Sequence, residues 1–298
     1  MSYEIKNLGK NDWPQSLFEI PQPPKELTYA GAIPDYSRKF LCVVGSRKYS
    51  DYGKEAATSI IMGLQGFPIT IVSGLALGID SIAHRIAMRA MLPTIAVPGS
   101  GLSPKAIHPA SHISLAEEII ASGGTLISEF DRDMKATLWS FPMRNRIMAG
   151  LSHAVLLVEA EQKSGTLITA KFASEYNKEL LAVPGSIFAP SAEGPNMFLR
   201  LGATLVRNSD DVLEALGIGK LDFENAPLRS EKQSSAGLKK YSNCSANELL
   251  IVEILREPIG RDELLSRSPL SVPETQTILS LLELKGLLEE RLGELKLI

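Results

Sequence analysis

The sequence predicts an α/β protein with a doubly wound, mostly parallel sheet and a second, small domain at its C-terminus. Three observations predict this class. Short apolar runs recur between residues 40 and 216, and each is too short to form a helix. Helical stretches separate these runs, and Gly, Ser or Pro follows several of them. This rhythm is typical of buried parallel strands that alternate with helices.

The chain begins with a proline-rich stretch, residues 1–38, which we expect to form an arm that packs on the next domain. Its first residues lack the apolar core of a signal peptide, and no run of 18 or more apolar residues occurs. The two cysteines, Cys42 and Cys244, lie far apart, and Cys42 falls inside an apolar run, as a small core residue would. The sequence therefore predicts a cytoplasmic protein without a membrane span.

The main domain is predicted to span residues 39–217. Its strands are expected at FLCVV (40–44), ITIVS (69–73), PTIAV (93–97), TLIS (125–128), AVLLVE (154–159), LLAV (180–183) and ATLV (203–206). In open α/β sheets, ligands bind outside the carboxyl ends of the strands, where helix N-termini point their N–H groups outward. The loops expected on that edge are 43–50, 71–80, 96–104, 159–166 and 182–190. We expect the functional site there.

A polar stretch with Pro, Gly and Ser, residues 218–245, is typical of a linker. Residues 246–298 are predicted to form the second domain. Its helices are expected over 247–257, near 260–268 and over 273–286, and two short strands are expected around Arg291–Glu294. Three helices followed by a β-hairpin indicate a small winged-helix domain.

Charge limits the kinds of partner that the chain can bind. Charged residues make up 22% of the chain and the formal net charge is −3 at pH 7, so the basic excess common among nucleic-acid binders is missing. A nucleic-acid site would therefore depend on a local cluster of cations rather than on the field of the whole protein.

Common catalytic motifs are absent from the sequence. It has no Gly-x-x-x-x-Gly-Lys-Ser/Thr loop, and VVGSRKYSDYG (43–53) lacks the Gly-x-Gly-x-x-Gly spacing of dinucleotide sites. It has no Gly-x-Ser-x-Gly elbow, and its four histidines form no recognised zinc pattern. Asp80 and His84 are four apart, so a helix would let them bond, either as an acid–base pair or as a structural pair. We therefore predict no metal site and no cofactor.

Cationic residues are placed near the predicted carboxyl edge of the sheet. Arg47 follows the first strand of the main domain, and Lys163 follows the strand that begins at residue 154. The segment between Asp133 and Glu159 supplies Arg144 and Arg146 and no acidic residue. Each of these cations alone could be a solvated surface charge. Together on one edge they form a set of donors suited to phosphates.

Small residues and one aromatic ring accompany these cations. Ser164, Gly165 and Thr166 follow the lysine, and their backbone N–H groups would face the same edge. Phe141 is either a core residue or a platform on which a base could stack. Several phosphate sites with one aromatic ring favour a strand of nucleic acid over a single nucleotide.

These motifs resemble those of the DprA/Smf family of bacterial DNA-processing proteins. The resemblance rests on VVGSRKYSDYG, IVSGLALGIDSIAH, LISEFD, FPMRNRIMAGLS, VEAEQKSGTLITA and AVPG. It implies an extended Rossmann-like domain that binds single-stranded DNA and forms a homodimer. It also implies that the protein loads the RecA recombinase onto incoming single strands during natural transformation, without catalytic turnover and without a cofactor.

By matching motif, the resemblance assigns DNA-binding roles to Arg47, Phe141, Arg144, Arg146 and Lys163. The complete set of predicted DNA-binding residues adds their neighbours Ser46, Asn145, Ser164, Gly165 and Thr166. Two departures from the family pattern matter. Many members carry a helical domain where this chain has the proline-rich arm, and many have Tyr-Pro where it has IHP (107–109), so the role of that loop is open.

The predicted winged-helix domain is acidic. Residues 245–298 contain ten Asp or Glu and six Lys or Arg, and the presumed recognition helix, Pro273–Lys285, contributes one lysine and no arginine. A helix that reads a DNA groove normally brings cations to the phosphates. The predicted winged-helix fold therefore favours DNA as the partner of this domain, whereas its negative charge favours a protein. We predict a protein partner.

Two alternatives stand beside a non-enzymatic recombination mediator. A nucleotide hydrolase or phosphoribohydrolase of the lysine-decarboxylase-like Rossmann group would carry a Pro-Gly-Gly-x-Gly-Thr loop, whereas this chain has KSGT (163–166) without the double glycine. A scaffold that only recruits proteins through the acidic domain would not retain single-stranded oligonucleotides.

Overall fold

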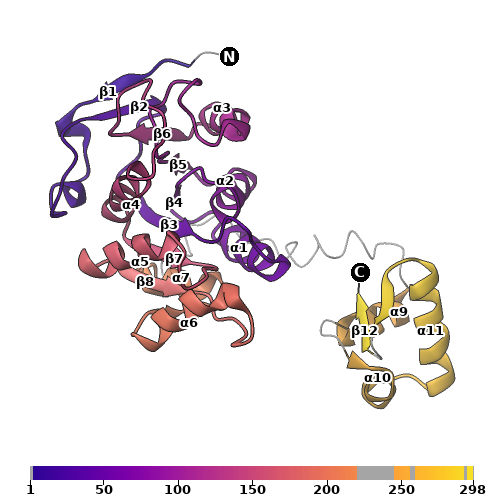
Figure 1. Cartoon of the computed structure of the whole chain (residues 1–298). Helices are drawn as coiled ribbons and strands as arrows, with labels where there is room; N and C mark the ends of the chain where they lie inside the picture. The colour runs from indigo at the N-terminus through magenta and orange to yellow at the C-terminus, as the bar shows by residue number, and fades with distance from the viewer. Residues whose placement is uncertain (1–2, 220–244, 256–258, 292–293, 298) are drawn as a thin grey trace. The chain divides into compact units, whose positions relative to one another are not determined.

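The computed structural model describes residues 3–219, 245–255, 259–291 and 294–297. The chain divides into two compact units, Met1–Pro227 and Leu228–Ile298 (Figure 1). Most of the predicted linker, residues 220–244, lies outside the described residues. In the part of the chain that the structure describes, no helix is both long enough and apolar enough to cross a membrane.

A nine-stranded sheet forms the centre of the first unit. Its strands are β1 (Lys6–Leu8), β2 (Leu27–Gly31), β3 (Lys39–Val44), β4 (Ile69–Ser73), β5 (Thr94–Ala96), β6 (Thr125–Ser128), β7 (Ala154–Leu157), β8 (Glu179–Ala182) and β9 (Thr204–Leu205). They lie in the order β1-β2-β6-β5-β4-β3-β7-β8-β9. Strands β3 to β9 run parallel, whereas β1 and β2 pair antiparallel at one edge. The predicted doubly wound, mostly parallel sheet of Rossmann-like type is confirmed, and the proline-rich arm contributes β1 and β2 to it.

The strand order changes direction at β3. From β3 the chain adds β4, β5 and β6 on one side and then returns to add β7, β8 and β9 on the other. Strand β3 pairs with β7 from Leu41 opposite Ala154 to Val44 opposite Leu157. The loops that follow these two strands therefore leave neighbouring points of the carboxyl edge and diverge, which opens a crevice between them.

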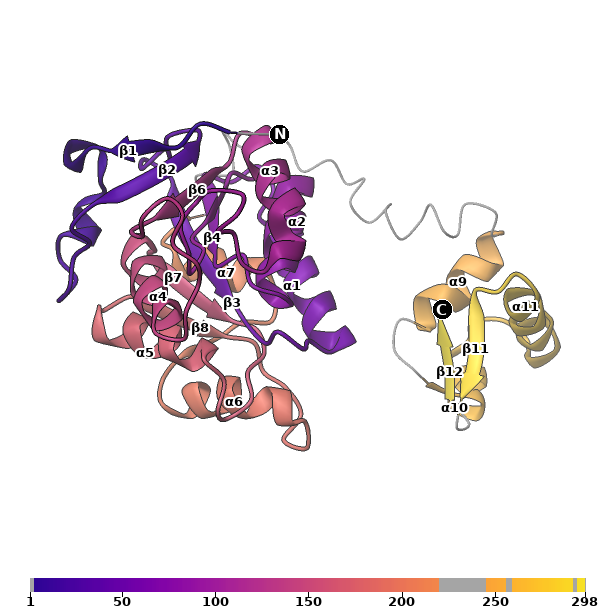
Figure 2. The same ribbon diagram turned by 45° about the horizontal axis from the view of Figure 1, so that its top comes forward.

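Helices cover both faces of the sheet (Figure 2). One face carries α1 (Asp51–Gly63), α2 (Ile79–Arg89), α3 (Ile113–Ala121) and α7 (Ser209–Ala215), and the other carries α4 (Ser140–Leu151), α5 (Thr166–Glu175) and α6 (Glu193–Arg200). Alternate residues of β3 supply the two cores: Leu41 and Val43 pack toward α1 and α2, and Cys42 and Val44 pack toward α4 and α5. Cys42 is fully buried, as expected, and burial raises the pKa of its thiol.

Two polar side chains of α2 are buried, but they do not pair with each other. Asp80 accepts a hydrogen bond from the backbone N–H of Gly74 (3.1 Å), and Nδ1 of His84 lies 2.8 Å from Oγ1 of Thr94. The expected Asp80–His84 pair was therefore wrong, because the loop after β4 and strand β5 offer each side chain another partner.

The buried His84 should make stability depend on pH. Burial lowers the pKa of His84 from 6.5 to about 3, and the nearby charges of His112 and Arg144 act in the same direction. Between pH 6.5 and about 3, His84 is therefore protonated in the unfolded chain but neutral in the folded chain. The folded state becomes less stable relative to the unfolded state as the pH falls through this range. We expect the free energy of unfolding to fall by up to about 1.4 kcal/mol per pH unit from this group. Urea unfolding of wild type and His84→Gln at pH 7, 6 and 5 checks this, and equal pH slopes would contradict it.

In the second unit, the described residues form three helices and a three-stranded antiparallel sheet. Its elements are α9 (Ala246–Ile254), β10 (Ile259–Gly260), α10 (Arg261–Arg267), α11 (Val272–Leu284), β11 (Leu288–Arg291) and β12 (Glu294–Leu297), with β12 between β10 and β11. Ser245 and Ser271 begin α9 and α11 through capping boxes with Glu248 and Glu274. The predicted helices and hairpin are present, and the winged-helix assignment stays a prediction.

Candidate functional site

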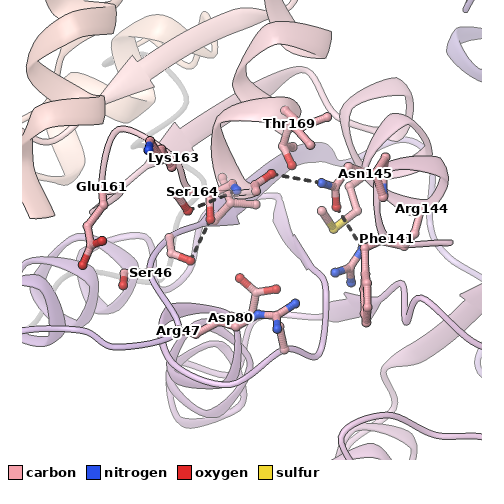
Figure 3. Close-up of a pocket in the computed structure, with 18 of the residues that line it drawn as sticks. Ser46, Arg47, Asp80, Phe141, Arg144, Asn145, Glu161, Lys163, Ser164 and Thr169 are labelled. Atoms are coloured by element: carbon pink, nitrogen blue, oxygen red, sulfur yellow. Dashed lines mark hydrogen bonds between the residues drawn. The ribbon is translucent and has the colours of Figure 1, made fainter. Parts of the chain in front are cut away.

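A cavity of about 610 Å³ opens at the carboxyl edge of the sheet, between the loops that follow β3 and β7. We call it the carboxyl-edge pocket. The loop after β4 and residues of α2, α4 and α5 complete its lining (Figure 3). The lining includes four cations and two carboxylates, namely Arg47, Lys48, Arg144, Lys163, Asp80 and Glu161. The pocket therefore carries an excess of positive charge in a chain whose net charge is negative.

The structure brings nine of the ten predicted binding residues to this pocket. They are Ser46, Arg47, Phe141, Arg144, Asn145, Lys163, Ser164, Gly165 and Thr166. In Figure 3, Lys163 and Ser164 lie on one side of the hollow and Phe141 and Asn145 on the other. The fold thus brings these nine residues together, and their contact with DNA stays a prediction.

The turn before α5 provides a lysine and leads into the start of a helix. The side chain of Lys163 is exposed, and a Cβ added at Gly165 would meet no atom within 4 Å, so this turn is open to a ligand. Oγ1 of Thr166 donates to the carbonyl of Gly45 (3.0 Å), which ties the start of α5 to the end of β3. Within the turn, the N–H groups of Ser164 and Thr166 already donate to protein oxygens (2.9 and 3.2 Å), so an anion here would be attracted by the ammonium of Lys163 and by the positive end of the α5 dipole. This side of the pocket is therefore suited to a phosphate.

Arg47 and Phe141 form a pair at the opposite side. The guanidinium carbon of Arg47 lies 5.2 Å from the centre of the Phe141 ring, within the range of a cation–π contact. The ring of His108 lies 5.7 Å from the same ring, and Phe141 also packs on Gly99. The IHP loop, whose role the sequence left open, thus supports Phe141. The ring is half-buried, so it is neither a core residue nor fully free.

Arg144 lies at the floor of the pocket and is largely committed to the protein. Its Nη1 donates to the carbonyls of Gly74 and Val97, which follow β4 and β5, and its Nε donates to Oδ1 of Asn145 (3.1 Å). Burial raises the pKa of Asp80, and the positive charge of Arg144 opposes that rise. Arg144 therefore supplies a fixed positive charge and holds two strand ends together.

Arg146 does not line the pocket, and its expected place there is corrected. It is 4% exposed, and its Nη2 donates to Oε2 of Glu129 in a buried ion pair. Residues that are two positions apart in a helix point about 200° apart around its axis. The side chains of Arg144 and Arg146 therefore cannot both point into one cavity. Glu129 lies before Asp133, outside the segment whose lack of carboxylates had indicated free arginines.

The anion position at the start of α1 is filled by the protein itself. Glu159 is 3% exposed and accepts hydrogen bonds from the backbone N–H of Ser50 (2.9 Å), the hydroxyl of Ser50 (2.5 Å) and the hydroxyl of Ser191 (3.0 Å). In nucleotide-binding α/β folds, the helix after the first parallel strand holds a phosphate at this point. Phosphate can therefore approach α5 but not α1. Sequence reasoning missed Glu159 because its partners lie far away along the chain.

Other side chains of the pocket also escaped sequence reasoning. Lys48, Asp80, Leu138 and Glu161 line the cavity but were not among the predicted binding residues, although three of them lie inside the motifs quoted above. Among the described residues, no group of three or more His, Cys, Asp or Glu side chains is placed to hold a metal ion.

Comparison with known proteins gives matches over most of the chain. A family model described as DNA recombination-mediator protein A matches residues 4–217. The chain is 37% identical to Protein Smf of Escherichia coli K12 over 92% of this chain and 72% of that protein. It is also 37% identical to DNA processing protein DprA of Streptococcus pneumoniae R6, over 67% of this chain and 70% of that protein.

Two solved structures share this fold. The structure of DprA from Streptococcus pneumoniae gives a TM-score of 0.66 at 34% identity and covers 71% of this chain and 74% of that one. The structure of DNA processing protein A from Helicobacter pylori, described for its single-stranded DNA binding mode, gives 0.65 at 28% identity. It covers 72% of this chain and 98% of that one.

Proposed function

The chain belongs to the DNA recombination-mediator protein A family, and from this premise we propose that it binds single-stranded DNA in the carboxyl-edge pocket. The Helicobacter pylori relative is described for its single-stranded DNA binding mode, and the family description is that of a recombination mediator. We therefore assign this chain to DNA processing as a recombination mediator that works without catalytic turnover.

One observation carries the proposal more than any other: cations, the start of a helix and an aromatic ring line the same cavity. Arg47 and Lys163 provide two exposed charges, the start of α5 provides the positive end of a helix dipole, and Phe141 provides a ring. Phosphate contacts and base stacking carry little sequence information. Binding should therefore tolerate any base sequence and prefer unpaired strands, whose bases are free to stack.

The nucleotide hydrolase alternative is not favoured. Its loop would require a double glycine that KSGT (163–166) lacks, and Glu159 already fills the anion position at the start of α1. Incubation with nucleoside monophosphates tests it directly, because release of free base above background would support a hydrolase.

The finer part of the proposal concerns partners. We infer that the protein protects incoming single strands and loads RecA onto them in the cytoplasm, as a homodimer through its Rossmann-like domain. We infer that the acidic second unit contacts a protein rather than a DNA groove. Within it, the lysine at the end of α11, Lys285, donates to Glu248 (2.7 Å), so its charge is already partly neutralised.

Binding of a labelled oligo-dT, compared with a matched duplex, tests the proposed ligand and the pocket together. Wild type should retain the single strand, and unlabelled duplex should compete poorly. Arg47→Ala should bind the single strand about tenfold less tightly, because it removes a phosphate partner and the contact with Phe141. A gel shift or fluorescence anisotropy titration measures both effects. Equal affinity for the two DNA forms, or an unaffected Arg47→Ala, would contradict the proposal.

A further inference from the structure

We propose that Trp139, with Leu138 beside it, extends the DNA-binding surface beyond the carboxyl-edge pocket and stacks on a base of the strand that leaves it. This inference rests on the proposed function and adds a binding residue and a direction to it. Leu138 lines the pocket and is 92% exposed, and Trp139, which is 57% exposed, is the residue immediately before α4. Two large apolar side chains thus meet solvent at the rim of a phosphate-binding cavity.

The indole of Trp139 is held in place although it is exposed. Its ring lies 5.7 Å from the ring of Phe130 at an interplanar angle of 82°, and Phe130 is 8% exposed. An edge-to-face contact of this kind fixes the orientation of an aromatic side chain. More than half of the residue's surface nevertheless stays open. A rigid ring with an open surface loses little conformational freedom when a base stacks on it.

The loop that carries Trp139 is anchored at several points. The backbone N–H of Gly101 donates to the carbonyl of Met134 (2.8 Å), and that of Ser103 donates to the carbonyl of Arg132 (3.0 Å). The hydroxyl of Ser140, next to Trp139, donates to the carbonyl of Gly99 (2.5 Å). The loop after β5 and the loop after β6 therefore form one connected surface beside the pocket.

Charge favours this side of the pocket for a polyanion. The loop after β5, residues 97–112, contains Lys105 and no carboxylate, and the loop after β6 exposes Arg132 and Lys135 together with Asp131 and Asp133. On the other side of the pocket, the loop after β8, residues 183–192, contains no charged residue, and α6 then places Glu193 in its first turn and Arg200 in its last. DNA phosphates gain from nearby cations and lose from unpaired carboxylates. We therefore infer that the strand leaves toward Trp139 rather than over β8.

Tryptophan emission tests the contact directly. The chain has two tryptophans, and Trp13 is 7% exposed and packed in the core of the first unit. In a Trp13→Phe variant, all tryptophan emission therefore comes from Trp139. Titration with oligo-dT of about 16 nucleotides, the upper end of site sizes for a single-strand-binding domain, should quench that emission in parallel with binding. Emission that stays unchanged while the oligonucleotide binds would overturn the proposal.

Affinity measurements with matched variants supply the second test. Trp139→Ala should weaken oligo-dT binding at least about fivefold, the lower end of what loss of one base-stacking ring costs, and Trp139→Phe should restore most of the affinity. Phe188, 89% exposed in the loop after β8, is the control, and Phe188→Ala should bind as wild type does.

The outcomes separate this inference from the proposed function. If wild type does not retain oligo-dT, the proposed function itself fails. If wild type binds, Arg47→Ala is weakened and Trp139→Ala binds as wild type does, only the present inference fails. Sedimentation of Trp139→Ala reveals the other possible occupant of this surface: loss of a dimer with DNA binding intact would show that a second copy of the chain covers Trp139.

Discussion

Replacing Arg146 by alanine is expected to lower the free energy of unfolding by about 3 to 5 kcal/mol, the largest effect of any single substitution considered for this chain. Arg146 is 4% exposed and pairs with Glu129, whose side chain is also mostly buried. Burial raises the pKa of Glu129, and the charge of Arg146 opposes that rise. Without the guanidinium, a carboxylate is left in the interior without its counter-charge, and chemical denaturation measures the cost.

Three further variants make this expectation specific. Arg85→Ala removes an arginine whose ion pair with Glu118 is about half exposed, and it should cost less than about 1 kcal/mol. The double variant Arg146→Leu/Glu129→Leu removes both charges and should recover most of the lost stability. Arg146→Lys keeps a charge and should fall between wild type and alanine. A loss below about 1 kcal/mol in Arg146→Ala would show that the buried ion pair with Glu129 does not stabilise the fold as expected.

Removing Arg47 and Lys163 together is expected to weaken binding of oligo-dT by about 100-fold, since a hydrogen bond to a charged group contributes on the order of 1.5 to 3 kcal/mol. Both side chains are exposed and line the carboxyl-edge pocket, so the variant should fold normally. Each lost phosphate contact should also flatten the dependence of log affinity on log salt by about 0.7 for a single strand. Anisotropy titrations at several salt concentrations measure both quantities.

A double variant with the same change in net charge provides the control. Arg89 and Arg200 are exposed in the last turns of α2 and α6, and Arg89→Ala/Arg200→Ala should keep both the affinity and the salt slope. If this control loses as much affinity as Arg47→Ala/Lys163→Ala, binding depends on the net charge of the protein and not on the pocket.

The affinity of Arg146→Ala for oligo-dT tests the position of Arg146 outside the pocket. If this variant folds and keeps wild-type affinity, that position is supported in solution.

The central part of the fold could be predicted because its signals are local. All seven strands from β3 to β9 appear in the sequence as short apolar runs followed by turn residues, and each was expected within a few positions. Strands β1 and β2 were not expected. Their pairing is set by contacts as distant as Thr28 opposite Ser128, and proline-rich surroundings hide the short strands. Non-local pairing of this kind leaves no periodic signal in the segment itself.

Site residues could be predicted where their place in the sequence alone determines where the side chain lies in the fold. Arg47 and Lys163 follow parallel strands, so the sheet carries both to one edge. Arg144 and Arg146 lie on a helix, and their directions depend on its rotation. Every residue from Arg144 to Leu151 is buried, so α4 shows no alternation of apolar and polar faces from which that rotation could be inferred. The partners of Glu159 are likewise visible only in the folded chain.

The carboxylate of Glu159 has a consequence for selectivity. Cells contain free mononucleotides, which compete with DNA for any surface that binds phosphate. Because the carboxylate of Glu159 occupies the anion position at the start of α1, a mononucleotide can make few phosphate contacts. A polymer can contact Arg47, Lys163 and the rim of the pocket at the same time. The fold would therefore sort its ligands by chain length rather than by the identity of the base.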